Sequence, residues 1–170
     1  MVTCSIFAWK MDLNIPYLIF MKKLILLVAA LFAVSTLSAQ TYKVGDYYDV
    51  EGKKGVVFEV SEDGKHGLIV ALTEPANTMS WYKAMELGKQ LTDGWYLPSR
   101  DELITLFKVS EVVNNKLKEV GDGLSLGGYC FYWSTTEFGV DFAWIVRLSK
   151  DSWGGSCKSN DFCVRAVSKF

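Results

Sequence analysis

Three short apolar runs, separated by polar turns that contain glycine, follow one another in the first half of the chain. They cover residues 42–50, 55–60 and 66–72 and are rich in Val, Ile, Leu and Tyr, which favour β-strands. The turns at 51–54 and 63–65 are short enough for hairpins. The pattern therefore predicts a small antiparallel sheet of consecutive strands.

After a break at 74–78 the apolar residues recur every three or four positions, which is the spacing of a helix with one buried face. The stripe predicts a helix of about three turns. We expect this helix to end near residues 92–94, where Gly94 can adopt a positive φ. The stripe consists of Trp81, Ala84, Met85, Gly88 and Leu91.

The stretch GWYLPSRDEL, residues 94–103, predicts an extended segment followed by a second helix. Ser99 and Glu102 form an S-x-x-E capping box, in which each side chain binds the other residue's backbone amide at the helix start. Pro98 keeps the residue before it extended, so that residues 95–97 can lie under both helices. The carboxylates of Asp101 and Glu102 lie in the first turn of the second helix, where they interact favourably with the helix dipole. We therefore interpret them as structural rather than catalytic.

Apolar residues at helical spacing continue through this second helix and into a third. A glycine-containing turn at 121–123 is expected to end the third helix. The apolar faces consist of Leu103, Leu106 and Phe107 in the second helix, and of Val112, Val113, Leu117 and Val120 in the third.

Strand-like runs return from residue 129 onward, at 131–136, 142–148 and 162–167. The run 142–148 is apolar at both odd and even positions, so we expect it to be a central strand. The whole pattern predicts an α+β fold with N-terminal antiparallel hairpins, two to three short helices and a C-terminal antiparallel sheet.

The N-terminal part has the layout of a secretory signal peptide. The basic start Met21-Lys22-Lys23 precedes an apolar run at 24–34 and small residues that end at Ala39, after which we place the cut. An uncleaved membrane anchor is the alternative, although the apolar run is short for a membrane span. Residues 1–20 hold no recognisable element and are interpreted as a misassigned upstream start. The predicted arrangement is an upstream segment at 1–20, a signal peptide at 21–39 and a single domain at 40–170, exported to the periplasm, the cell surface or the medium.

Removal of the signal peptide also removes Cys4 and leaves Cys130, Cys157 and Cys163. An odd number of cysteines leaves at least one thiol unpaired. In an oxidising compartment, Cys157 could bridge to Cys163 across a hairpin, or Cys130 could bridge to one of them. All three could instead be small buried apolar side chains, and the sequence leaves these alternatives open.

The charge pattern and the single histidine limit the chemistry that the chain can perform. The net charge is −1, and the scattered Lys and Arg residues offer no basic surface for nucleic acid. His66 has no nearby partners for a metal site or a catalytic triad. We therefore expect no metal, no cofactor and no enzymatic activity.

Arg165 is unusual because it lies within the apolar run 162–167. An arginine in such a run must either reach the sheet surface or meet an acid. We predict an ion pair with Glu137. If that pair is buried, removal of one partner should cost about 3–5 kcal/mol, because the other charge is left unpaired.

Four motifs occur in a fixed order along the chain. They are Trp81 with Ala84, the stretch from Gly94 to Leu103, the run Tyr132 to Glu137 with Ala143-Trp144, and the ending Val164 to Phe170. In this order they resemble the Lcl C-terminal domain family, formerly domain of unknown function 1566, over most of the chain after residue 39. The resemblance implies a C-type-lectin-like fold, also used by formylglycine-generating enzymes, and an exported or surface binding domain. For the name-giving member it implies attachment to sulfated polysaccharide. Among the residues discussed, those expected to be structural are Trp95, Pro98, Ser99, Glu102, Trp133, Glu137, Trp144 and Arg165.

In the implied fold, the C-terminal strands and the loops between them form the ligand surface. Trp153 offers a flat apolar face to a sugar ring or an aromatic group, and the neighbouring polar residues can hydrogen-bond. Alternatively, these loops are solvated turns and Trp153 folds back onto the core. The ligand-binding candidates are Phe138, Asp141, Lys150, Asp151, Trp153, Lys158, Asn160 and Asp161.

Two activities of relatives with this fold are not supported by the sequence. Glu74-Pro75-Ala76 only partly matches the calcium-binding motif of lectins, lies too early in the chain and lacks an amide oxygen. Cys157 and Cys163 enclose residues 158–162, which is one residue too many for the reactive cysteine pair of formylglycine-generating enzymes.

The leading functional hypothesis is an exported, non-catalytic domain that binds a glycan or a surface protein through its late loops, as in adhesion. The alternative is a structural or accessory subunit of a cell-surface assembly. An enzyme would need an acid pair, such as Asp151 and Asp161, in one pocket. Glycan binding predicts an exposed Trp153 beside polar groups, whereas docking predicts an apolar patch of roughly several hundred Å².

Overall fold

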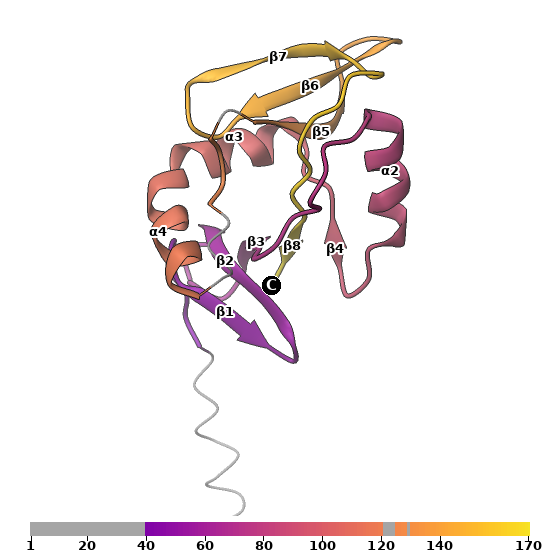
Figure 1. Ribbon diagram of the computed structural model, residues 1–170. Helices are drawn as coiled ribbons and strands as arrows, with labels where there is room; N and C mark the ends of the chain where they lie inside the picture. Colours follow the sequence, from indigo (N-terminus) through magenta and orange to yellow (C-terminus); the bar gives the residue numbers. More distant parts are fainter. Residues whose placement is uncertain (1–39, 121–124, 129) are drawn as a thin grey trace, which may run out of the picture. The chain divides into compact units, whose positions relative to one another are not determined.

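Two antiparallel sheets and three helices make up the part of the chain that the computed structural model describes, residues 40–120, 125–128 and 130–170 (Figure 1). Gln40–Phe170 form one compact unit. The predicted upstream segment, the signal peptide and the helix end at 121–123 lie outside the described residues. None of the helices in the described ranges has the length and apolar character needed to cross a membrane.

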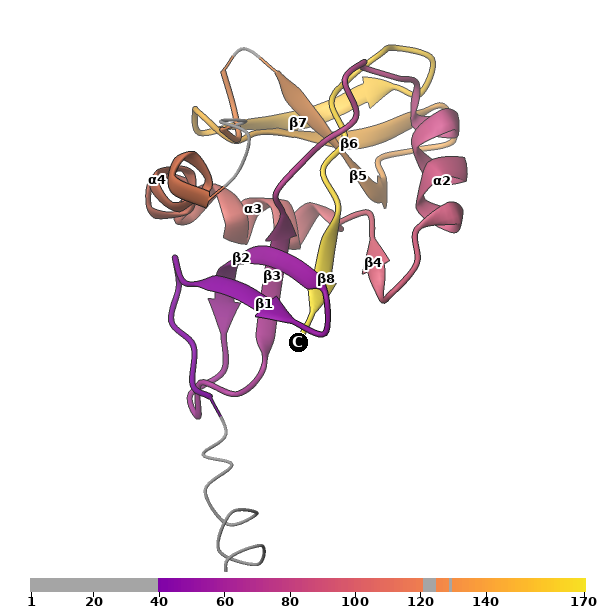
Figure 2. The same cartoon turned by 60° about the horizontal axis from the view of Figure 1, so that its bottom comes forward.

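The first sheet has five strands in the order β1-β2-β3-β8-β4 (Figure 2). Consecutive antiparallel pairing of β1, β2 and β3 confirms the predicted sheet of hairpins. The last strand of the chain, β8, lies between β3 and β4 and pairs with both. The strands are β1 (Tyr47–Val50), β2 (Lys53–Val60), β3 (Gly67–Ala71), β4 (Trp95–Tyr96) and β8 (Val167–Lys169).

Two tight turns of the same kind lead into β2 and β4. In each turn an acidic residue and the following glycine have positive φ, namely Glu51 (52°) with Gly52 (84°), and Asp93 (57°) with Gly94 (76°). Positive φ at both central residues is the signature of a type I′ turn, whose twist matches that of antiparallel strands. The positive φ predicted for Gly94 is confirmed. It belongs to the turn before β4, because α2 already ends at Gln90.

The three predicted helices are present as α2 (Trp81–Gln90), α3 (Arg100–Lys108) and α4 (Ser110–Val120). The capping box that begins α3 is confirmed: the Glu102 amide donates to Ser99 Oγ at 3.3 Å, and the Ser99 amide donates to Glu102 Oε2 at 2.7 Å. The Tyr96 hydroxyl donates to the other carboxylate oxygen at 2.7 Å. Strand β4 is therefore tied to the start of α3.

The second sheet has the order β5-β6-β7, with β5 (Phe131–Glu137), β6 (Phe142–Arg147) and β7 (Ser152–Cys157). The prediction that 142–148 forms a central strand is confirmed. The expectation that Trp153 lies in a loop was wrong, because residues 152–157 pair with β6 along its whole length. The segment SWGGSC has low intrinsic β-propensity, and pairing with a strong apolar neighbour overrides that preference.

The strand predicted at 162–167 was also wrong. Only isolated bridges occur there, between Met79 and Phe162 and between Tyr132 and Cys163, and β8 starts at Val167 in the other sheet. Arg165 lies in the middle of this connection with its side chain fully buried. Residues 162–166 pass from the second sheet to the first, so they cannot pair continuously with a single neighbouring strand.

The main core lies between the two sheets, where α3 is sandwiched, with α4 and α2 on opposite sides of the molecule (Figures 1 and 2). Leu103 and Leu106 of α3 and Val113 and Leu117 of α4 are completely buried in it. Burial of each such side chain stabilises the fold by about 1.5–3 kcal/mol. A second cluster fills the space between α2 and the second sheet and includes Trp81, Trp133 and Ile145.

The predicted Arg165–Glu137 ion pair is wrong. Arg165 Nη1 lies 3.4 Å from Glu74 Oε2, and Nη2 donates to the Leu72 carbonyl at 2.9 Å. Glu137 instead accepts from Lys158 Nζ at 2.6 Å. Arg165 follows Val164, which packs in the α2 cluster, so the alternation of an extended chain directs Arg165 to the opposite side.

Of the disulfide pairings that the sequence left open, the structure contains one. Cys130 and Cys163 form a disulfide with their Cα atoms 6.2 Å apart, and Cys157 is free. The bridge joins the residue before β5 to the connection that leads into β8. It therefore links the two sheets through the chain segments that enter them.

Candidate binding surface on the second sheet

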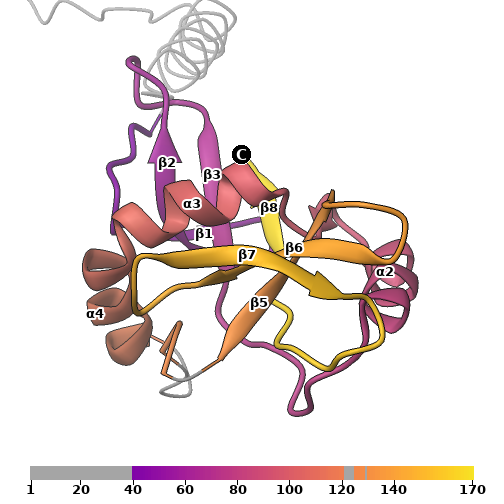
Figure 3. The same cartoon turned by 90° about the horizontal axis from the view of Figure 1, so that it is seen from above.

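The predicted ligand-binding residues fall into two groups at opposite ends of the second sheet (Figure 3). One group surrounds the β5–β6 turn, where the Lys158 amide donates to the Asp141 carbonyl at 2.9 Å. The other lies at the β6–β7 turn. The length of β6, about 17 Å at 3.4 Å per residue, separates them. The first group is Phe138, Asp141, Lys158, Asn160 and Asp161, and the second is Lys150, Asp151 and Trp153.

Lys158 is buried, unlike its neighbours on the loop, with 5% of its surface exposed. Its ammonium donates to Glu137 Oε2 at 2.6 Å and to the Val140 carbonyl at 2.7 Å, and lies 4.5 Å from the centre of the Trp81 ring. These contacts tie the β5–β6 turn to the start of α2. The geometry gives Lys158 a structural role rather than a place on the surface.

Four aromatic residues form a strip on the face of the second sheet that is turned toward α3. Trp153, 43% exposed, packs edge-on against Phe107 of α3 with ring centres 6.2 Å apart. Phe138, 56% exposed, packs edge-on against Trp144 at 4.8 Å. We call Phe107, Phe138, Trp144 and Trp153 the aromatic strip.

Strand register explains why these rings share one face. Trp144 lies opposite Gly155 and Val146 lies opposite Trp153, and residues that are paired across an antiparallel ladder point the same way. Gly155 leaves the space that the Phe138 ring occupies, since a Cβ at that position would collide with the ring. The glycines of β7 thus let an aromatic side chain from the β5–β6 turn lie on the strand.

Charged groups lie beside the strip. The Arg100 guanidinium lies 5.0 Å from the centre of the Trp144 ring, and its Nε and Nη2 both donate to Asp101 Oδ1, at 2.9 and 2.7 Å. Lys150 and Asp151 at the β6–β7 turn are exposed near Trp153. A ligand on the strip would therefore meet ring faces together with hydrogen-bonding groups of both signs.

Sequence reasoning identified Phe138 and Trp153 but missed Phe107 and Arg100. These two residues reach the strip because α3 packs against the second sheet, and no local motif signals that contact. Trp144 was expected to be structural and proves to be half-buried at the centre of the strip.

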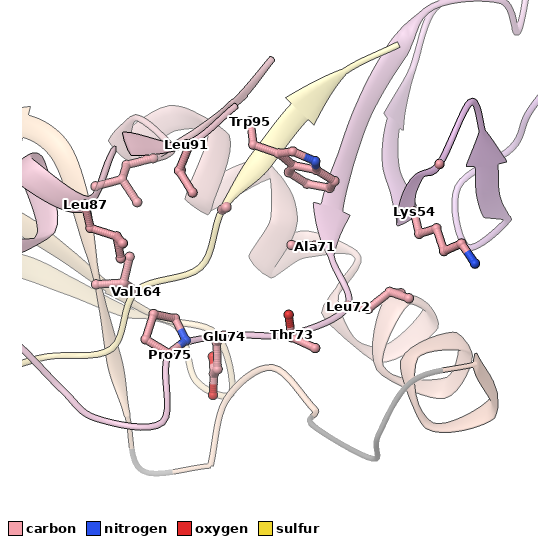
Figure 4. A pocket seen from close by; sticks show the side chains of 13 residues that line it. Lys54, Ala71, Leu72, Thr73, Glu74, Pro75, Leu87, Leu91, Trp95 and Val164 are labelled. Atoms are coloured by element: carbon pink, nitrogen blue, oxygen red, sulfur yellow. The ribbon is translucent and has the colours of Figure 1, made fainter. Parts of the chain in front are cut away.

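The other residues expected to be structural take different positions. Pro98 and Trp133 are buried, and the Trp133 indole donates to the Met79 carbonyl at 2.8 Å. Glu137 is largely exposed and Trp95 half-buried. The Trp95 side chain lines a cleft between the ends of β3 and β4 and the approach to β8 (Figure 4).

The second sheet and its turns carry several acidic side chains and the free Cys157. Asp151 precedes β7 and Asp161 follows it, so the acid pair considered for catalysis does not converge in one pocket. Within the described ranges, no group of three or more His, Cys, Asp or Glu residues could hold a metal ion. Hydrogen bonds from Ser159 lower the pKa of the Cys157 thiol, which lies on the exposed edge strand β7.

Comparison with known proteins gives one finding for this chain. The family model for the Lcl C-terminal domain matches residues 55–168. The matched segment begins within β2 and ends within β8, so it contains the second sheet and the whole aromatic strip. No curated protein sequence matches the chain.

Proposed function

Because its residues 55–168 match the family model, the chain belongs to the Lcl C-terminal domain family, and we propose that it is an exported, non-catalytic binding domain. Its ligand is held on the aromatic strip and the adjoining turns of the second sheet. The ligand that we favour is a glycan.

The distribution of exposed apolar side chains carries this proposal. Of the seven large hydrophobic residues that are exposed in the described part of the chain, four lie on the second sheet or its turns. Scattered single apolar residues are normal on a protein surface, whereas their concentration on one element marks an interaction site. The four are Phe138, Val140, Phe142 and Trp153.

The setting of Trp153 favours a sugar over an entirely apolar ligand. Its exposed ring lies beside the polar turn that contains Lys150 and Asp151. A flat apolar ring with hydrogen-bonding groups at its rim matches a sugar, which has an apolar face and a rim of hydroxyls.

The β5–β6 turn favours a second candidate, docking to a partner protein in a cell-surface assembly. Val140 at its tip is 87% exposed, and Phe138 and Phe142 flank it. Three exposed apolar side chains at one turn form the kind of patch that another protein covers.

Export is supported by the cysteines. A disulfide between Cys130 and Cys163 is typical of an oxidising compartment and rare in the cytosol. Together with the signal-like pattern at 21–39, this supports secretion or surface display.

A glycan array with the purified protein tests the proposal. Trp153→Ala and Phe138→Ala should each weaken binding to the recognised glycan by about tenfold or more, as expected for central aromatic contacts. Tyr82→Ala is the matched control, because Tyr82 is an equally exposed aromatic on α2, away from the strip. A Tyr82→Ala effect equal to that of Trp153→Ala would contradict binding at the strip.

A silent array would contradict the glycan assignment and leave docking. In that case Val140→Asp, which adds a charge at an exposed tip without disturbing the core, should release the protein from its native assembly. Size-exclusion chromatography of envelope extracts would detect the shift. Unchanged elution would contradict docking through this turn.

A further inference from the structure

The two sheets of the described chain have four edge strands, β1 and β4 in the first sheet and β5 and β7 in the second. Natural proteins keep such edges from pairing with other chains by making them short, charged or covered. Strand β4 has two residues, and β1 has four and carries the charged Asp49. Strand β5 is covered by the connection before β8, since the Trp133 amide donates to the Cys163 carbonyl at 3.0 Å and the Cys163 amide donates to the Phe131 carbonyl at 2.9 Å. Three of the four edges are therefore protected.

Strand β7 has none of these protections. Its six residues, SWGGSC, include no charged residue and no proline, and they pair with β6 without a bulge. Figure 1 shows β7 at the top of the view, on the outside of the second sheet. An edge of this kind is a template on which another strand can pair.

The hydrogen-bond pattern shows which backbone groups of β7 face outward. The Lys158 amide donates to the Asp141 carbonyl at 2.9 Å, so these two residues form a hydrogen-bonded pair that continues the ladder between β6 and β7. In an antiparallel ladder such pairs alternate with pairs whose amides and carbonyls point away from each other. The backbone groups of Trp153, Gly155 and Cys157 therefore point away from β6.

Most of these outward groups are unpaired within the described part of the chain. The Cys157 carbonyl accepts from the Asn160 amide at 3.0 Å. The Cys157 amide, and the amides and carbonyls of Trp153 and Gly155, have no protein partner among the described residues. The edge thus offers alternating donors and acceptors to an incoming strand.

From this edge we propose that a second copy of the chain pairs with it, β7 against β7 in antiparallel orientation. The two copies then share one continuous sheet in the order β5-β6-β7-β7-β6-β5, related by a two-fold axis. Gly155 lies opposite the partner's Gly155, and Trp153 lies opposite the partner's Cys157. This pairing joins the outward amides and carbonyls of both strands.

The same pairing covers exposed aromatic surface. Side chains that lie opposite each other across an antiparallel ladder point to the same face. The Phe138 ring occupies the space beside Gly155, so the Phe138 rings of the two copies meet at the two-fold axis. Trp153 lies beside the partner's Cys157. Both Phe138 and Trp153 are exposed in the single copy.

Charge favours this register over the two neighbouring ones. In this register Lys150 lies next to the partner's Asp161, and no two like charges face each other along β7 or in its flanking turns. A shift of two residues in one direction would place Lys150 opposite the partner's Lys158. A shift in the other direction would place Asp151 opposite the partner's Asp161. Like charges directly opposite each other destabilise strand pairing.

Sedimentation velocity of the purified protein, without any glycan, tests the pairing. The average mass should rise from monomer to dimer between about 1 and about 300 µM, because a small interface associates weakly. Cys157→Ser should dimerise like the parent, since it keeps the outward amide, and it excludes a chance disulfide through the free thiol. A protein that stays monomeric overturns the proposal and leaves the edge to a strand of a different protein. Oligomers larger than a dimer overturn the two-fold pairing.

Two variants locate the interface. Cys157→Pro removes an outward amide and leaves the ladder with β6 intact, because proline is tolerated where the amide faces away from the sheet. Gly154→Lys adds a charge to the edge, and a Cβ at that position has no other atom within 4 Å. Each should weaken dimerisation at least tenfold relative to Cys157→Ser. A variant that melts like the parent and dimerises equally well overturns the proposal.

Cross-linking tests the register. Opposite residues of a hydrogen-bonded antiparallel pair have Cα atoms about 5.5 Å apart, a separation that a disulfide can span. Trp153→Cys should therefore form a disulfide-linked dimer with the partner's Cys157 on a non-reducing gel. The double variant Trp153→Cys with Cys157→Ser should stay unlinked, and equal cross-linking of both proteins overturns the register.

This inference goes beyond the proposed function and does not depend on it. Association is measured without a ligand, and neither Gly154 nor Cys157 belongs to the aromatic strip. A silent glycan array therefore has no bearing on the dimer, and a monomeric protein has no bearing on glycan binding.

Discussion

Arg165 shows how a single buried charge organises the connection between the two sheets. Its guanidinium has no exposed surface, and burial lowers its pKa below the ordinary value while Glu74 raises it. Glu74 also accepts from Tyr132, so three residues distant in sequence share one network. The stability of this network depends on keeping both charges together.

Replacement of Glu74 is the direct test of this network. Glu74→Ala should lower the free energy of unfolding by about 3–5 kcal/mol, because Arg165 would be left as an unpaired buried charge. Glu137→Ala should cost only about 1 kcal/mol, since Glu137 is mostly exposed and Lys158 keeps its other contacts. Urea denaturation measures both values. A Glu74→Ala protein as stable as the parent would contradict the proposed role of Glu74 in this network.

Two tyrosines should make the fold sensitive to high pH. Burial, together with the Glu74 charge, raises the pKa of Tyr132 to about 12, and burial and the Glu102 hydrogen bond raise the pKa of Tyr96. A folded-state pKa above the unfolded value of 10.0 gives a stabilisation that is complete below pH 10. This stabilisation is lost as the pH rises toward 12.

Denaturation measured at several pH values above neutrality tests this expectation. The free energy of unfolding should fall between pH 10 and pH 12, and Tyr132→Phe should make that fall shallower. The variant also loses the hydrogen bond to Glu74, so the slope with pH is compared and not the absolute stability. An unchanged slope in Tyr132→Phe would contradict the assignment of the raised pKa.

At the scale of elements, the sequence was informative wherever a local pattern decides the structure. The stripe of α2, the capping box of α3 and the hairpins β1–β3 are set by residues a few positions apart. The sequence did not predict β7, because its glycines form a strand only through pairing with β6. It did not predict the ion pair of Arg165 in the connection before β8, because the partner, Glu74, is 91 residues earlier in the chain.

The candidate surface was predictable to a similar extent. The sequence predicted exposed aromatic residues in the late turns, and Phe138 and Trp153 are such residues. It did not predict that they lie near Phe107 and Arg100, because that proximity depends on how α3 packs against the second sheet. The C-type-lectin-like arrangement implied by the resemblance stays a prediction.

The capping box gives an element-scale prediction. Ser99→Ala should lower the free energy of unfolding by about 1 kcal/mol, because the Glu102 amide loses its acceptor at the start of α3. Thr78→Ala, at an exposed position outside any helix or strand, is the control and should change stability by less than about 0.5 kcal/mol. Equal effects from the two substitutions would argue against a stabilising cap.

At the scale of the whole molecule, two features hold the described chain together across long sequence distances. Strand β8 closes the first sheet between β3 and β4. The disulfide joins residues that are 33 positions apart and restricts the unfolded chain. Both act on the segment that passes from the second sheet back to the first.

Removal of the disulfide should destabilise the whole unit. Cys130→Ala with Cys163→Ala should cost about 3–4 kcal/mol in free energy of unfolding, given the length of the loop that the bridge closes. Cys157→Ser is the control and should cost much less. Under non-reducing, denaturing conditions, thiol titration of the chain from Gln40 should find one free cysteine. Two or three would contradict the bridge.

The described chain begins and ends at the same place, since the rings of Tyr42 and Phe170 lie 5.1 Å apart in contact with Tyr48. A short linker could therefore join residue 40 to residue 170, and new termini could be opened at the exposed β6–β7 turn. Such a circular permutant should keep the same fold. By the same geometry, the unit could be inserted whole into a surface loop of a host protein and occupy little more room at the junction than a hairpin.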